Sequence, residues 1–105
     1  MLEINDDNFK EEVLESDQLV LVDFFTKWCS PCKRMIPILE QLANDNPQVK
    51  VVKIDVEENI STGVKFDISS VPTLIFLKDG SEIKRIVGLQ NLMSLQENTN
   101  NLLEA

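Results

Sequence analysis

The sequence contains two cysteines, Cys29 and Cys32, separated by Ser30 and Pro31. This spacing lets the two sulfur atoms meet within the first turn of a helix. Pro31 favours a helix that begins here, because its missing N–H is not needed in the first turn. Cys29 would then lie at the helix N-terminus, where unpaired N–H groups and the helix dipole stabilise a thiolate. Thiolate is the attacking species in disulfide exchange, so we expect Cys29 to be the nucleophile and Cys32 the resolving thiol.

The rest of the composition excludes several other chemistries. The chain has no histidine, which removes Cys-His and Ser-His catalytic pairs. Two cysteines cannot complete a four-ligand zinc site or an iron–sulfur cluster within one chain, so we expect no metal. Three alternatives to a redox pair remain: a metal site shared between two chains, two inert thiols, or a structural disulfide. The last is disfavoured, because so small a loop constrains little of the unfolded chain.

Length and charge restrict the class of protein. The chain has 105 residues, of which 43% are hydrophobic, and this predicts a single domain over 1–105. Eighteen acidic residues against ten basic ones give a net charge of -8. This balance argues against nucleic acid and anionic membranes as partners. The N-terminus lacks the basic and apolar regions of a secretory signal, so we expect a cytoplasmic protein.

The elements that must position the cysteines alternate along the chain with short connections. Continuous apolar runs predict buried strands, and apolar residues at helical spacing predict helices. Asp79-Gly80 predicts a hairpin between the last two strands. The order is β-α-β-α-β-α-β-β-α, which implies a mixed central sheet flanked by helices on both faces, an α/β fold. The expected strands are 2–4, 19–25, 49–56, 73–77 and 82–87, and the expected helices are 9–15, 31–46, 60–66 and 91–103.

Two charged residues interrupt otherwise apolar strands. Asp23 is either a carboxylate that reaches water at the strand end or a buried acid with a raised pKa. In the second case Asp23 could take a proton from Cys32 through water and return it later. Lys53 is either an outward-facing lysine or a partner of this acid.

From end to end, the chain resembles the thioredoxin family. The resemblance implies the thioredoxin fold, the reduction of protein disulfides through a redox-active Cys29–Cys32 disulfide with no bound cofactor, and recycling by a flavoprotein thioredoxin reductase. It also implies a cis Pro72 facing the cysteines, proton transfer by Asp23, and an Asp23–Lys53 pair. The matching motifs are Val22-Asp23-Phe24, Trp28-Cys29-Ser30-Pro31-Cys32-Lys33, Pro37, Lys53, Val71-Pro72-Thr73, Asp79-Gly80 and Val87-Gly88. The departures are Ser30 where glycine is usual, Phe25 where many members have tryptophan, and Ser70 where glycine is common.

A shallow apolar patch around the cysteines is the expected docking surface for protein disulfides. It consists of Trp28 as a partly exposed lid, together with Val71, Pro72, Gly88 and Leu89. The backbone of Val71 would pair with an extended substrate. We expect a monomer. The rival interpretations are an interaction module that keeps the fold, a dithiol oxidant or isomerase of secretory compartments, and a glutaredoxin.

Overall fold

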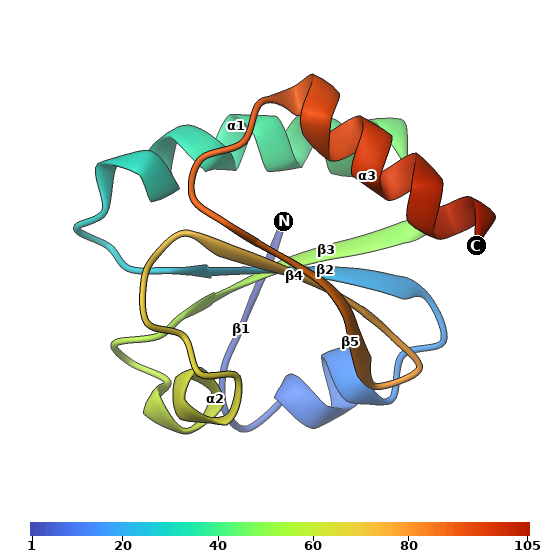
Figure 1. Ribbon diagram of the computed structural model, residues 1–105. Helices are drawn as coiled ribbons and strands as arrows, with labels where there is room; N and C mark the ends of the chain where they lie inside the picture. The colour runs from blue at the N-terminus through green and yellow to red at the C-terminus, as the bar shows by residue number, and fades with distance from the viewer.

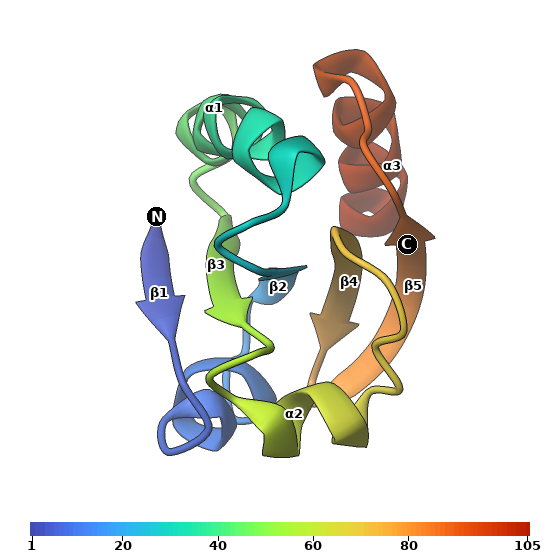
Figure 2. The same ribbon diagram turned by 90° about the vertical axis from the view of Figure 1, so that its left-hand side faces the viewer.

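The computed structural model describes residues 1–105 and contains one five-stranded sheet covered by helices on both faces (Figure 1). Helices α1 and α3 lie on one face, and α2 and a short π-helix, η1, lie on the other (Figures 1 and 2). The elements are β1 (Leu2–Ile4), η1 (Lys10–Leu14), β2 (Leu19–Phe25), α1 (Ser30–Asp45), β3 (Val49–Asp55), α2 (Ile60–Lys65), β4 (Thr73–Lys78), β5 (Ser81–Val87) and α3 (Leu92–Glu104).

The strands are arranged in the order β1-β3-β2-β4-β5, which Figure 2 shows from one edge to the other. β1, β3 and β2 are parallel, whereas β4 and β5 are antiparallel additions. Parallel neighbours need a crossover, and α1 provides one between β2 and β3. The predicted mixed sheet and the helices on both of its faces are therefore confirmed.

Two hydrophobic clusters fill the space on either side of the sheet. β2 is buried along its whole length and alternates between them, because successive side chains of a strand point to opposite faces. Val20, Val22 and Phe24 pack on the η1 and α2 side. Leu19 and Leu21 pack on the α1 and α3 side, with Met35, Leu39 and Leu42 of α1. This alternation places Asp23 on the face that α1 covers.

The first helix differs from its prediction. An α-helix was expected over 9–15, but the segment forms the five-residue π-helix η1, in which the Glu15 N–H donates to the Lys10 carbonyl at 2.9 Å. The apolar spacing was sufficient to place Phe9 and Val13 in the core. It did not distinguish this wider turn from an α-helical one.

The hairpin between β4 and β5 forms at the predicted Asp79-Gly80 turn. Both residues have positive φ, 51° for Asp79 and 79° for Gly80. This pair of conformations is typical of the tight turns that match the twist of antiparallel strands.

No helix of the structure is both long and apolar enough to cross a membrane.

Candidate functional site: a cysteine pair at the start of α1

The two cysteines lie where β2 gives way to α1 and are joined by a disulfide with a Cα–Cα separation of 5.2 Å. Cys29 is the N-cap of α1, and Ser30 and Pro31 form its first two positions, as the proline predicted. Cys29 is half-buried, whereas Cys32 is 2% exposed. The side chain of Ser30 is exposed. Only the first cysteine of the pair therefore presents its sulfur to an approaching molecule.

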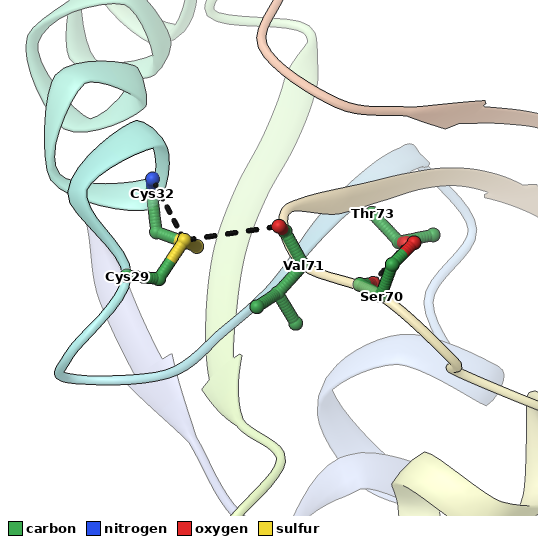
Figure 3. Close-up of a disulfide and its surroundings, with 5 residues drawn as sticks. All are labelled: Cys29, Cys32, Ser70, Val71 and Thr73. Atoms are coloured by element: carbon green, nitrogen blue, oxygen red, sulfur yellow. Dashed lines mark hydrogen bonds between the residues drawn. A yellow bond between two sulfur atoms is a disulfide. The ribbon is translucent and has the colours of Figure 1, made fainter.

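The helix start surrounds the Cys29 sulfur with backbone dipoles. The backbone N–H of Cys32 donates to Cys29 Sγ at 3.1 Å, which Figure 3 draws as a dashed line. The first N–H groups of a helix have no partner inside the helix, and the helix dipole adds positive potential at this end. Both effects favour a negatively charged sulfur, so a thiolate at Cys29 is stabilised when the disulfide is open.

A loop before β4 approaches the disulfide from the other side. The Val71 carbonyl oxygen lies 3.8 Å from Cys29 Sγ, and Val71 itself is half-buried (Figure 3). The Val71–Pro72 peptide bond is cis, as the resemblance implied. Two hydrogen bonds hold the loop: Thr73 Oγ1 donates to the Ser70 carbonyl at 2.7 Å, and the Gly88 N–H donates to the Pro72 carbonyl at 2.8 Å.

The residues expected to form the apolar patch differ in their exposure. Trp28 is 84% exposed and Leu89 44% exposed, while Gly88 is partly buried. Pro72, by contrast, is buried, so its ring offers little surface for docking. The sequence did not indicate this burial, because a proline that enters a strand lies equally well on a surface. Among these residues, the exposed apolar side chains are therefore those of Trp28 and Leu89, with part of Val71.

Asp23 is a buried carboxyl group rather than one that reaches water. It is 1% exposed, and neither of its oxygens has a hydrogen-bond partner in the protein. Burial raises the pKa of Asp23 to about 7, although the positive charge of Lys53 acts in the opposite direction. Near neutral pH this group is therefore divided between its charged and neutral forms. It lies on the sheet face covered by α1, which carries Cys32.

Lys53 lies beside Asp23 in the register of β3 against β2. It is half-buried, and its Nζ lies 5.4 Å from the centroid of the Phe25 ring. Lys53 and Cys32 line the same shallow pocket. Glu3 of β1 also lines this pocket. Nothing in the sequence distinguishes Glu3 as a site residue, since the pairing of β1 with β3 is not visible in the chain order.

No group of three or more Cys, His, Asp or Glu side chains is arranged to hold a metal ion. The reactive groups of the site are the two sulfur atoms of the disulfide, and the buried carboxyl group of Asp23 lies on the face covered by α1. This fold and this site define a class of proteins that exchange disulfides through a dithiol at a helix start.

Comparisons with known proteins identify the family to which the chain belongs within this class. The family model described as Thioredoxin matches residues 1–101. The chain is 45% identical over 92 residues to a thioredoxin of Chlamydia muridarum, and this match covers 88% of each chain. It is 42% identical over 98 residues to a thioredoxin of Staphylococcus haemolyticus, with 92% of each chain covered. The chain therefore belongs to the thioredoxin family, and it is a thiol–disulfide oxidoreductase that uses its Cys29–Cys32 disulfide.

Proposed function

We propose that Cys29 is the nucleophile and Cys32 the resolving cysteine in the reduction of protein disulfides. The observation that carries this assignment is their unequal burial: Cys29 is half-buried at the N-cap of α1, and Cys32 is 2% exposed in the turn behind it. A bulky protein disulfide can meet only the more accessible sulfur. The N–H of Cys32 at 3.1 Å supports the same assignment, because it favours a thiolate at Cys29.

The reaction then consists of two exchanges. The Cys29 thiolate attacks one sulfur of the substrate disulfide, and the other substrate sulfur leaves as a thiolate. Cys32 next transfers its thiol proton through water to the Asp23 carboxylate and attacks Cys29 Sγ, which releases the second substrate thiolate. Two electrons pass to the substrate, and the Cys29–Cys32 disulfide remains. A pKa of about 7 suits Asp23 to this task, because the group can both accept and return a proton near neutral pH.

Substrate docking is assigned to the surface beside the disulfide. Trp28 and Leu89 would contact apolar side chains, and the Val71 backbone would align an extended segment next to Cys29. In this proposal Gly88 and Pro72 support the loop through their hydrogen bond, and Lys53 modulates Asp23.

The disulfide must be reduced again after each turnover. We assign this step to a thioredoxin reductase, a flavoprotein, and we place the protein in the cytoplasm as a monomer of one domain. Reduction of insulin disulfides with NADPH and such a reductase tests the overall activity. A chain that fails to reduce insulin, although a reductase accepts it, would be an interaction module rather than a carrier of electrons.

Trapping experiments test the two cysteine roles. Cys32→Ser should accumulate a mixed disulfide between Cys29 and a protein substrate, because the second exchange cannot occur. Cys29→Ser should show neither trapping nor turnover. Intact mass spectrometry after mixing with oxidised insulin distinguishes the two variants. Trapping by Cys29→Ser and none by Cys32→Ser would reverse the assignment.

A further inference from the structure

Three charged residues form one row across the parallel half of the sheet. Glu3 of β1 is in register with Lys53 of β3, and Lys53 is in register with Asp23 of β2. Residues in lateral register point to the same face of a sheet. That face is the one covered by α1, because Ile4, the neighbour of Glu3, packs on the opposite side. Lys53 therefore lies between two carboxyl groups.

The row runs from solvent into the core. Glu3 is exposed, Lys53 is half-buried and Asp23 is 1% exposed. The shallow pocket beside α1 is lined by both Glu3 and Lys53 and reaches Cys32. Lys27 and Lys33 add positive charge to its wall.

Other charged groups also face this region. Asp55 lies two residues after Lys53 on β3, hence on the same face of the sheet, and is 1% exposed. Lys27 forms an ion pair of 2.8 Å with Glu58, and its pKa is raised by Glu58 and further by the charges of Asp55 and Glu3. On the other side of Asp23, β4 contributes the apolar Leu74. Glu3 is therefore the acidic member of the pocket lining, and its distance from Asp23 is set by two strand spacings.

We propose that Glu3 is a positioning residue of the disulfide exchange, which acts through Lys53 on the charge state of Asp23. The inference rests on the proposed role of Asp23 as the proton acceptor for Cys32. The Glu3 carboxylate attracts the Lys53 ammonium group toward the edge of the sheet. That attraction holds the positive charge of Lys53 further from Asp23, so the neutral form of Asp23 persists to higher pH.

The direction of the effect follows from Coulomb interactions. Without the negative charge of Glu3, the Lys53 ammonium is free to turn toward Asp23 and stabilise its carboxylate. The pKa of Asp23 must then fall. Loss of Lys53 must raise the pKa of Asp23, since Lys53 lowers it in the intact protein.

The test is a titration of the Asp23 carboxyl carbon by NMR in the reduced full-length protein. The variants are Glu3→Gln, Lys53→Met, their combination, and Glu11→Gln as a matched control on the exposed side of η1. Glu3→Gln should move the Asp23 midpoint to lower pH, and Lys53→Met should move it to higher pH. The shift caused by Glu3→Gln should shrink in the Lys53→Met background. An unchanged midpoint in Glu3→Gln, an equal shift in Glu11→Gln, or an equal shift in both backgrounds would overturn the proposal.

A second measurement separates this proposal from the function on which it rests. The rate at which Cys32 releases a mixed disulfide is followed against pH in the wild type, Glu3→Gln and Asp23→Asn. The profile of Glu3→Gln should shift to lower pH with its Asp23 midpoint. If Asp23→Asn leaves the rate and its profile unchanged, the proton-acceptor role fails while the charge coupling stands. If Asp23→Asn slows release but Glu3→Gln leaves the profile in place, the coupling fails and the role stands.

Discussion

At the scale of single residues, the burial of Asp23 links one carboxyl group to the stability of the whole fold. A carboxylate without hydrogen bonds in an apolar interior is costly, and the protein lowers that cost by keeping the proton. The folded pKa of about 7 lies above the ordinary value of 3.8. The folded state therefore holds this proton more tightly than the unfolded chain does. The penalty appears as pH rises through the interval between the two values and is complete above it.

Asp23→Ala should therefore stabilise the protein at high pH and have little electrostatic effect at low pH. One pKa unit corresponds to about 1.4 kcal/mol, so the gain in free energy of unfolding should be about 4 kcal/mol larger at about pH 8.5 than at about pH 3. The small cavity left by the substitution lowers the free energy of unfolding by the same amount at both pH values, so it does not affect this difference. Denaturant midpoints of both proteins across this range measure the difference. Asp7→Ala, an exposed carboxylate, is the control. An Asp23→Ala protein that gains no stability as pH rises would contradict the burial of a charged carboxylate.

Trp28 gives the redox state an optical signal. It is the only tryptophan, it is 84% exposed, and it directly precedes Cys29. A disulfide at contact distance quenches indole emission, so reduction with dithiothreitol should increase the fluorescence of Trp28. A Cys29→Ser, Cys32→Ser double variant should not respond. Unchanged emission in the wild type would mean that the indole points away from the pair and would remove its role in docking.

At the scale of elements, the strands buried on both faces were the most predictable from the sequence. β2 begins and ends at the predicted residues, because a short continuous apolar run is typical of a central strand that is buried on both faces. Lateral register was not predictable, since it depends on contacts between residues far apart in the chain. Glu3 was missed for this reason: its neighbour Lys53 is distant in sequence. The sequence pattern alone did not predict the cis Val71–Pro72 bond, which rested on the family resemblance.

Three glycines offer a graded test of backbone conformation. A Cβ at Gly63 of α2 would make ordinary contacts with Val56 from 3.5 Å, so Gly63→Ala should stabilise by about 0.4–1 kcal/mol. Gly88 has a φ of 96° and open space around it, and Gly88→Ala should cost about 1–2 kcal/mol from backbone strain alone.

Gly80 has both a positive φ and a close neighbour. Its φ is 79°, and a Cβ would lie 3.0 Å from the Leu14 carbonyl oxygen, so Gly80→Ala should be the most destabilising of the three. Chemical denaturation of the three variants ranks them in one experiment. Gly80→Ala equal in stability to Gly88→Ala would show that the chain around Leu14 moves aside without cost.

At the scale of the whole molecule, the net charge of -8 is spread over extents of 33 × 30 × 20 Å. At about 0.01 M salt the Debye length is roughly 30 Å, so every acidic group repels the others across the entire protein. Added salt also weakens surface ion pairs such as Lys27–Glu58, but exposed pairs contribute little. Screening of the repulsion between acidic groups should therefore outweigh the weakening of the ion pairs.

We expect the free energy of unfolding to rise by on the order of 1 kcal/mol when salt increases from about 0.01 M to about 0.3 M. Glu11→Lys, which makes the net charge less negative by two units at an exposed position, should show a weaker dependence. Urea titrations at each salt concentration measure both proteins. Stability that falls with salt would mean that the ion pairs outweigh the repulsion.

The two edges of the sheet determine how readily another chain can pair with it. An open strand edge is a template on which another chain can add a strand. β1 offers only three residues at one edge, and β5 at the other carries exposed Glu82, Lys84 and Arg85. The short β1 and the charged side chains of β5 therefore disfavour the addition of a strand from a second chain at either edge.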